Sequence, residues 1–215
     1  MKIVEQSHRI IKPTNWLSEL KDIEYAGRIA YKSENKITDD SYESFIKMII
    51  DRGHEAVIEM ADMKVHFVTD RGITHELVRH RLASYIQEST RYCNYSATKF
   101  GKEVTFIRPS MPCQDPDEYN ADFIAWKMMC ETAEQQYLSL VDVASGWSPQ
   151  QARSVLPNCT KTEIFMKANF REWRHIFKLR AISKAAHPDM RRLMIPLYEE
   201  CRRLCPAIFE MGDPE

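Results

Sequence analysis

Hydrophobic and polar positions along the first sixty residues predict one strand and two helices. Residues 2–11 alternate weakly between apolar and polar side chains, which is typical of a half-buried strand. After Asn15 the apolar residues recur at helical spacing and predict a helix. They are Trp16, Leu17, Leu20, Ile23 and Ala26. Asp40 with Glu43 three residues later is a capping-box signature, so a second helix is predicted from there to Gly53.

The middle of the chain combines a strand, a short helix and a stretch without a clear period. Apolar and polar residues alternate over residues 63–69 and predict a strand that stops near Arg71. A short helix is predicted to run from there into Arg79-His80-Arg81. Residues 85–96 are polar and show no regular pattern, whereas residues 104–107 predict another strand.

One long amphipathic helix is predicted over residues 117–145, where apolar residues recur at helical spacing. Gly146 is expected to end it. Ser148 with Gln151 is a capping box, and Pro149 occupies the first helical position. A new helix is therefore predicted to start at that point.

Three further helix starts follow. The capping signature recurs at Thr160 with Glu163 and at Asn169 with Glu172. Pro188 stands where a final amphipathic helix would begin. These starts predict that the C-terminal half is helical.

Together these patterns predict an α+β fold, with a small, mostly antiparallel sheet, packed helices and a helical C-terminal half. The sequence contains no internal repeat, no low-complexity tract and no linker long enough to divide it. Residues 1–215 are therefore expected to form a single domain.

The composition is close to that of ordinary globular proteins. Hydrophobic residues make up 44% of the chain and charged residues 28%, which excludes a disordered tail protein and a coiled-coil rod. The longest apolar stretches fall far short of the ~20 residues that a transmembrane helix needs. Glu5, Gln6 and His8 interrupt the region where a signal peptide would be apolar. The expected location is the cytoplasm.

The cysteines are expected to be free thiols, because the chain is long and shows no secretion signal. They are Cys93, Cys113, Cys130, Cys159, Cys201 and Cys205. Their spacing contains no Cys-x-x-Cys pair and no companion histidine cluster, so no metal site is predicted. The last two cysteines are four residues apart, which suits the buried stripe of a helix.

Charge is unevenly distributed along the chain. The formal net charge of −1 argues against a general nucleic-acid coat protein or a membrane-surface protein. Locally, residues 112–145 carry a net charge of −6, whereas Arg153 to Arg180 carries +5. The basic segment is therefore expected to bind anions.

Arg79-His80-Arg81 is the densest cluster of basic side chains, and Ser89-Thr90-Arg91-Tyr92 follows it after seven residues. If residues 79–81 were helical, their side chains would point about 100° apart and would surround a ligand. Arginine binds phosphate or carboxylate groups through two parallel hydrogen bonds. An isolated Arg-His-Arg is more often a basic helix end that interacts with the helix dipole. The neighbouring motifs must therefore decide between a ligand site and an ordinary helix end.

Several motifs together make the chain similar to the flavin-dependent thymidylate synthase family. The signature of that family is Arg-His-Arg, seven or eight arbitrary residues and a serine, and here residues 82–88 separate the first motif from Ser89. Further agreement lies in Gly53-His54-Glu55, Arg153 to Pro157, Asn169-Phe170-Arg171 and Phe177 to Arg180. The resemblance extends from about residue 53 to 210, and the first fifty residues match only in general pattern.

The resemblance implies the reductive methylation of dUMP to dTMP. In that reaction 5,10-methylenetetrahydrofolate is the carbon donor, and reduced FAD, regenerated by NADPH, is the source of hydride. The resemblance also implies a homotetramer that binds FAD at subunit interfaces, without nucleic-acid or membrane partners.

Residue by residue, the resemblance assigns two groups of positions. The cofactor set, which is implied to hold FAD, is His54, Arg79, His80, Arg81, Asn169, Arg171 and His175. The substrate set, which is implied to hold dUMP, is Glu76, Arg79, Gln87, Ser89, Arg91, Arg153 and Arg180. Arg79 belongs to both sets.

Arg180 and Ser89 are the expected catalytic residues. Loss of the N3 proton would help uracil C5 to react with an electrophilic methylene group, and the permanent cation of Arg180 suits stabilisation of the resulting anion. Ser89 shows no sequence signature of nucleophile activation, so we assign it to binding and orienting dUMP. Arg91 is implied to pair with the phosphate, and Cys93 is not expected to act as a nucleophile.

Two other classes of function remain open from the sequence. An RNA-binding or nucleotide-binding module without catalysis would use the same arginines, and Tyr85, Tyr92 and Tyr95 would stack on bases. The near-neutral net charge and the lack of a known RNA motif disfavour it. A flavin-independent nucleotide-processing enzyme, such as a phosphatase, would need a carboxylate pair or histidines at metal-ligand spacing, and neither stands out.

Overall fold

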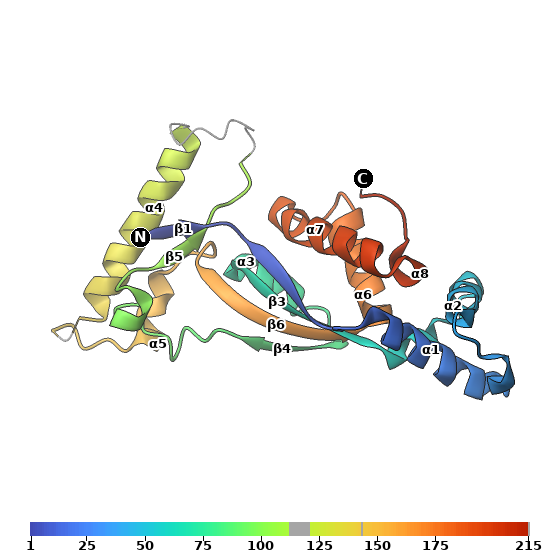
Figure 1. The fold of residues 1–215 in the computed structure, drawn as a ribbon. Coiled ribbons are helices and arrows are strands. Elements are labelled where there is room, and N and C mark those ends of the chain that lie inside the picture. Colours follow the sequence, from blue (N-terminus) through green and yellow to red (C-terminus); the bar gives the residue numbers. More distant parts are fainter. Residues whose placement is uncertain (112–120, 143, 215) are drawn as a thin grey trace. The chain divides into compact units, whose positions relative to one another are not determined.

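Two β-sheets run through the part of the chain that the structure, a computed structural model, describes: residues 1–111, 121–142 and 144–214 (Figure 1). The larger sheet has the strand order β2-β3-β6-β4. Its strands are β2 (Ser7–Lys12), β3 (Asp62–Asp70), β4 (Ala83–Gln87) and β6 (Lys161–Asn169). The smaller sheet pairs β1 (Lys2–Val4) in parallel with β5 (Thr105–Ile107), with Ile3 opposite Phe106.

Helices form most of the remaining structure. The longer ones are α1 (Trp16–Tyr31), α2 (Ser41–Asp51), α4 (Ala121–Leu140) and α7 (Pro188–Leu204), and the shorter ones are α3 (Arg71–Leu77), α5 (Pro149–Ala152), α6 (Phe170–Phe177) and α8 (Pro206–Phe209). Four 3₁₀ segments are η1 (Glu34–Lys36), η2 (Glu55–Met60), η3 (Thr98–Phe100) and η4 (Arg153–Val155) among the described residues, and η5 (Lys178–Ile182) is a π-helical turn. The predicted α+β class, with a small, mostly antiparallel sheet and packed helices, is confirmed.

The chain divides into two compact units. The first unit contains Met1–Ser7, Val68–Leu77 and Ile86–Ile164. The second unit contains His8–Phe67, Val78–Tyr85 and Phe165–Glu215. All four strands of the larger sheet contribute residues to both units, and the helices of each unit are described separately below.

In the first unit, α4 packs a buried face into a cluster with residues of the loop and strand before it. The buried members of this cluster are Tyr95, Val104, Phe106, Cys130, Tyr137 and Ala152. The carboxylate of Glu134, on the same helix, accepts a hydrogen bond from the Val104 N–H at 2.7 Å and lies 3.1 Å from the N-terminal amine. Burial of this carboxylate is therefore compensated by two donors.

In the second unit, aromatic side chains fill the core between α6, α7 and α8. The ring of Phe177 lies 5.4 Å from that of Tyr198 and 5.7 Å from that of Phe209. Trp173 is fully buried, and its indole N–H donates to the carbonyl oxygen of Met63 at 3.0 Å. This hydrogen bond fixes α6 to the N-terminal end of β3, which belongs to the same unit.

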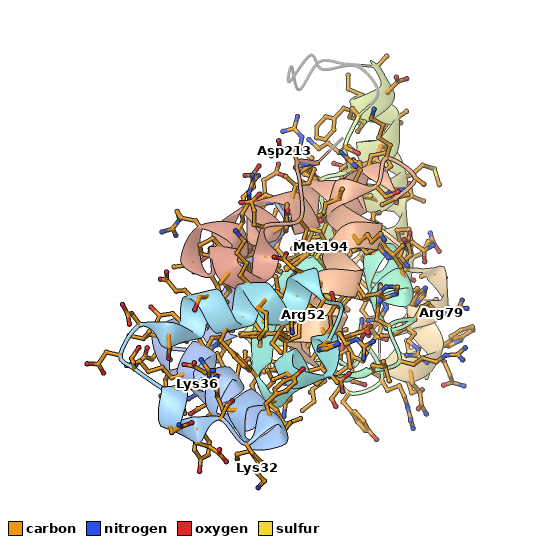
Figure 2. The ribbon with its side chains drawn as sticks, turned by 90° about the vertical axis from the view of Figure 1, so that its right-hand side faces the viewer. Lys32, Lys36, Arg52, Arg79, Met194 and Asp213 are labelled. Carbon is orange, nitrogen blue, oxygen red and sulfur yellow. The ribbon has the colours of Figure 1, made fainter. Side chains whose placement is uncertain are left out.

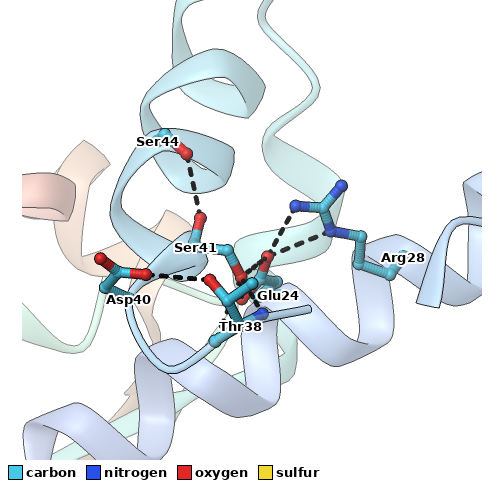
Figure 3. A network of polar contacts seen from close by, with 6 residues as sticks. All are labelled: Glu24, Arg28, Thr38, Asp40, Ser41 and Ser44. Carbon is cyan, nitrogen blue, oxygen red and sulfur yellow. Dashed lines mark hydrogen bonds and ion pairs between the residues drawn. The ribbon is translucent and has the colours of Figure 1, made fainter. Parts of the chain in front are cut away.

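A polar network fixes α1 to the start of α2 in the second unit (Figure 3). The carboxylate of Glu24, 1% exposed, accepts hydrogen bonds from Arg28 Nη2 at 2.8 Å and from Ser41 Oγ at 2.8 Å. The Arg28 guanidinium also lies 4.6 Å from the centre of the Phe45 ring. Asp40 is the N-cap residue of α2, but its carboxylate accepts from the Thr38 hydroxyl and does not cap the helix, so the predicted capping box does not form.

One predicted helix is wrong: Thr160 and Glu163 do not begin a helix but belong to the start of β6. The side chains of Thr162, Ile164 and Met166 are buried while their neighbours are more exposed. This two-residue period is that of a strand, and burial of its apolar face outweighs a local capping signature. The Thr160 hydroxyl instead donates to the carbonyl oxygen of Pro157 at 2.6 Å.

The observed ends of the other helices and strands agree with the predicted ends or differ from them by a few residues. Strand β4 occupies the start of the stretch for which no regular element was predicted. Helix α4 ends at Leu140, before the predicted end at residue 145, and the predicted start at 117 lies outside the described residues. The capping box at Ser148 and the start of α7 at Pro188 are confirmed.

Five cysteines are free thiols, as predicted, and Cys113 lies outside the described residues. Cys201 and Cys205 are buried, and burial raises the pKa of both thiols, that of Cys205 to about 12. Across the described ranges, no helix is both long and apolar enough to span a membrane.

Candidate active site

Arg79-His80-Arg81 lies in turns between α3 and β4, in the second unit. The expectation that a helix carries all three side chains is therefore wrong. Arg79 (labelled in Figure 2) and Arg81 are exposed, whereas His80 is 6% exposed. The two arginine side chains of this turn thus face solvent, whereas the side chain of His80 points into the interior of the second unit.

The buried imidazole of His80 has polar neighbours on both nitrogens. Its Nε2 accepts a hydrogen bond from Arg180 Nε at 3.2 Å. Its Nδ1 lies 3.4 Å from Oε1 of Glu172. The ring of His175 lies edge-on with its centre 5.9 Å away, and the Tyr85 hydroxyl donates to the backbone carbonyl oxygen of His80 at 2.9 Å.

Electrostatics determine the protonation state of His80. Burial, followed by the positive charges of Arg180 and His175, lowers its pKa to about 4. The ring is therefore neutral near pH 7, with one proton. Because Nε2 accepts from an arginine that always carries its protons, that proton is on Nδ1 and faces Glu172.

Glu172 is a site residue that the sequence reasoning missed. We expected it only as the partner of a helix cap, and the cap is present, since Asn169 Oδ1 accepts from the Glu172 N–H at 2.8 Å. The carboxylate is 8% exposed, and burial raises its pKa. Only its position beside Nδ1 of His80 distinguishes it from an ordinary helix-capping residue.

Arg180 follows α6 in the π-helical turn η5. Such turns widen the helix by one residue and occur often at functional sites. Its Nε is hydrogen-bonded to His80, which fixes the plane of the guanidinium. The orientation of this residue is thus set by the central residue of the Arg-His-Arg motif.

A groove of about 730 Å³ in the second unit is lined by three members of the cofactor set, Asn169, Arg171 and His175. Leu82, the residue after Arg81, lines it too. Arg171 Nη1 lies 2.6 Å from an oxygen of Glu59, and Arg174 Nη2 lies 3.2 Å from Glu55. Its two arginines are thus paired with carboxylates, and an exposed pair such as Arg171–Glu59 contributes little stability.

His54 is exposed and does not line this groove. It immediately precedes η2, and its Nδ1 is hydrogen-bonded to the Tyr31 hydroxyl at 2.7 Å. The two rings stack with their centres 6.5 Å apart. Tyr31 is therefore a second residue, absent from the predicted sets, that fixes a predicted cofactor residue.

Most of the substrate set lies in the first unit: Glu76, Gln87, Ser89, Arg91 and Arg153. The Gln87 amide donates to Thr74 Oγ1 at 2.9 Å and to Thr162 Oγ1 at 3.3 Å. Arg153 Nη1 donates to Thr90 Oγ1 at 2.8 Å. Arg79 and Arg180, the other two members, belong to the second unit together with the whole cofactor set.

Ser89 is a turn residue. Its carbonyl oxygen accepts from the N–H groups of Tyr92 and Cys93, and its hydroxyl accepts from the Arg91 N–H at 3.3 Å. No histidine or carboxylate of the described ranges is hydrogen-bonded to the Ser89 hydroxyl. This arrangement suits a residue that orients a ligand rather than an activated nucleophile.

The comparison with family models identifies the relationship. Residues 14–207 match the model described as "Thymidylate synthase complementing protein". The chain belongs to the flavin-dependent thymidylate synthase family. The matched residues include both predicted sets in full.

Similar curated proteins carry the family name. The "Flavin-dependent thymidylate synthase" of Mycobacterium marinum is 32% identical over 200 residues, which are 87% of this chain and 77% of that protein. The protein of the same name from Mycobacteroides abscessus is 33% identical over 202 residues, with the same coverage.

A solved structure shows the same fold. The UMP/dUMP methylase PolB from Streptomyces cacaoi, bound with 5-Br dUMP, has a TM-score of 0.76 and 18% identity. The similarity covers 98% of this chain and 96% of that one. At this identity the likeness establishes the fold alone.

The geometry also bears on the alternative functions. Tyr95 is 6% exposed with its hydroxyl bonded to Glu88, and Tyr85 is half-buried, so only Tyr92 of the three tyrosines, at 78% exposure, is open to stacking. An RNA-stacking surface is therefore not formed by these residues. Among the described residues no group of three or more histidine, cysteine or acidic side chains is placed to hold a metal.

Proposed function

We propose that the chain catalyses the reductive methylation of dUMP to dTMP, with 5,10-methylenetetrahydrofolate as carbon donor and NADPH as reductant. The observation that carries this proposal is the family match over residues 14–207, which includes every residue of the two predicted sets. The chain is accordingly a thymidylate-forming methyltransferase of the flavin-dependent family.

The residues of the second unit fit a flavin. A groove of about 730 Å³ is within the size range of cofactor sites, and Asn169, Arg171 and His175 face it with polar and cationic groups. Arg79 and Arg81 are exposed in the turn that leads to Leu82, which lines the groove, and they would supply positive charge for a pyrophosphate. His54 and His80 complete the proposed cofactor set, and FAD, when bound, supplies the hydride of the new methyl group.

Arg180 is the proposed electrostatic catalyst. Methylation replaces the C5 proton of uracil by a one-carbon group, so electron density must rise at C5, and deprotonation at N3 favours this. A guanidinium fixed beside N3 stabilises that anion without a proton of its own to lose. Neutral His80 holds Arg180 through Nε, and Glu172 holds the tautomer of His80.

The remaining substrate-set residues bind and orient dUMP. Ser89 positions the nucleotide through its hydroxyl, and Arg91 pairs with the phosphate. Glu76, Gln87, Arg79 and Arg153 provide further polar contacts. We further propose that the chain acts as one domain within a cytoplasmic homotetramer, with FAD bound at subunit interfaces.

The test is product formation with each component omitted in turn. The purified chain is expected to be yellow with FAD and to convert dUMP into dTMP only when NADPH and methylenetetrahydrofolate are both present. Mass spectrometry of the nucleotide pool measures the product. A colourless protein that forms no dTMP after reconstitution with FAD would contradict the proposal.

A further inference from the structure

Two cysteines of the first unit lie next to each other, although neither takes part in the proposed reaction. Cys130 belongs to α4, and Cys159 lies in the turn that precedes β6. Their sulfur atoms are 3.6 Å apart and share a thiol proton in a hydrogen bond. A disulfide bond has a length of about 2.05 Å, so a shift of roughly 1.5 Å along the line between the two sulfurs would bring them to bonding distance.

The two thiols differ in exposure and in protonation. Cys130 is 1% exposed, whereas Cys159 is half-buried, so solvent reaches part of this residue. The hydrogen bond from Cys130 lowers the pKa of Cys159 despite its partial burial, and the Trp126 indole donates to the same sulfur. That hydrogen bond, followed by burial, raises the pKa of Cys130. The thiolate therefore forms on Cys159, the more accessible sulfur, while Cys130 keeps its proton.

Apolar side chains surround this pair. Cys130 is a buried member of the cluster into which α4 packs, and Cys159 and Trp126 pack against that cluster. Oxidation of Cys159 to a sulfenic acid would place a polar hydroxyl in these surroundings, where its burial is costly. A disulfide has no polar hydrogen, so the apolar surroundings favour closure of the pair over persistence of the sulfenic acid.

We infer that Cys130 and Cys159 form a reversible redox site that closes to a disulfide when hydrogen peroxide reaches the chain. The Cys159 thiolate attacks one peroxide oxygen, the O–O bond breaks, and the other oxygen leaves as hydroxide and takes up a proton. The Cys130 sulfur then attacks the sulfur of the sulfenic acid, and the oxygen leaves as water with the Cys130 proton. In sum, two thiols lose two hydrogen atoms and one peroxide is reduced to two water molecules, and a dithiol reductant reverses the change.

The disulfide would tie α4 to a turn that contacts other segments of the first unit. The carbonyl oxygen of Asn158 accepts from the Arg71 N–H at 2.9 Å, where α3 begins. The carbonyl oxygen of Cys159 accepts from the Ile107 N–H of β5, also at 2.9 Å. Arg153, a member of the substrate set, precedes the same turn. We therefore expect oxidation to weaken dUMP binding; this expectation rests on the proposed function, whereas formation of the disulfide does not.

The primary test is a peptide map of the FAD-loaded wild type after treatment with hydrogen peroxide and alkylation of the remaining thiols. Mass spectrometry is expected to show a cross-link between the peptides of Cys130 and Cys159, and dithiothreitol should remove it. No variant is needed for this measurement, so it does not depend on the folding of a mutant. Peroxide-treated wild type without this cross-link would overturn the inference.

Three serine variants test the order of the two steps, and the melting temperature of each reduced variant shows that it is folded. In Cys130→Ser the resolving thiol is missing, so dimedone, a probe of sulfenic acids, should label Cys159. In Cys159→Ser neither the cross-link nor labelling of Cys130 is expected, and labelling of Cys130 there would contradict the proposed order. Cys93→Ser is the matched control, since Cys93 is half-buried and packs against the same cluster, and it should form the cross-link as the wild type does.

The effect on the substrate is measured by calorimetric titration of dUMP into FAD-loaded protein before oxidation, after oxidation and after reduction again. The dissociation constant is expected to rise at least about threefold on oxidation and to return on reduction, with no change in peroxide-treated Cys159→Ser. Equal affinities of the reduced and cross-linked wild type would refute the effect on dUMP binding. If the reduced wild type neither binds dUMP nor forms dTMP, the proposed function fails, and the peptide map still decides whether the redox site exists.

Discussion

At the residue scale, the contacts of His80 determine how the Arg180 guanidinium is held. Arg180 Nε donates to His80 Nε2, and the opposite nitrogen of the ring faces Glu172. Removing the carboxylate leaves the Nδ1 proton without its nearby acceptor, which allows the ring to rotate or to change tautomer. Glu172 is thus a positioning residue for the proposed electrostatic catalyst.

We expect Glu172→Ala to lower kcat by roughly tenfold to a hundredfold, as loss of one buried acceptor costs about 1–3 kcal/mol. The KM for dUMP should change less than about threefold, since Glu172 does not belong to the substrate set. Steady-state kinetics on protein with matched FAD content measure both constants. Glu172→Gln retains an acceptor and should recover most of the activity, and equal kcat values for the alanine variant and the wild type would contradict the positioning role.

The same histidine makes stability depend on pH. Its pKa is lowered to about 4 in the folded chain, against about 6.5 when unfolded, so the unfolded chain binds the proton more tightly. The free energy of unfolding should therefore fall as the pH decreases from about 6.5 towards about 4. In His80→Gln this contribution is absent, and urea unfolding across that window should show a shallower pH dependence. Identical slopes for both proteins would rule out His80 as the source.

A motif in the sequence marks some of the candidate site residues, whereas others are recognisable only from the folded structure. The Arg-His-Arg motif and the Asn169 cap are local signals, and both are found where the sequence places them. Glu172 carries no such signal of a site role, because its place in the candidate site comes from its neighbour His80, which lies far away in the sequence. The separation of 100 residues between His80 and Arg180 shows why spacing along the chain does not reveal that contact.

At the element scale, α1 and α2 depend on a buried charge. Glu24 is the acceptor for Arg28 and Ser41, and Gly27 lies so close to Phe45 that a Cβ there would approach the ring to 2.6 Å. We expect Glu24→Leu to lower the free energy of unfolding by about 3 kcal/mol, because Arg28 would remain partly buried without its counter-charge. Urea denaturation followed by circular dichroism measures the change.

The double variant Glu24→Leu with Arg28→Leu is the control for this network. Replacing a buried ion pair by apolar side chains is often neutral, so the double variant should recover at least half of the lost stability. A single variant as stable as the wild type would show that the Glu24 carboxylate contributes nothing to the packing of the two helices.

Some helices and strands can be predicted from the sequence more reliably than others. The helical spacing of α1, the cap of α6 and the proline that starts α7 are strong local signals, and each is confirmed. The prediction of a helix at β6 is wrong because Thr160 and Glu163 imitate a capping box, whereas the buried residues of the segment have the two-residue period of a strand. Burial on a sheet, a tertiary effect, decided the outcome.

At the scale of the whole molecule, the proposed homotetramer is tested by the mass of the assembly in solution. The FAD-loaded chain is expected to elute with the mass of four copies, because cofactor sites at subunit interfaces require the partners to be present. Size exclusion with light scattering, on protein with and without FAD, provides the measurement. A monomer that retains one FAD per chain would contradict binding at interfaces.

We propose that this chain exchanges the C5 hydrogen of dUMP for a methyl group and that Arg180 stabilises the activated uracil. Tritium release from [5-³H]dUMP measures that exchange directly. We expect tritium release in step with dTMP formation in the complete mixture, and no release when FAD is omitted from the stripped protein. In Arg180→Lys, which keeps the charge but not the planar fork, release should fall about a hundredfold or more. Near-native release from Arg180→Lys, or release that does not require FAD, would contradict it.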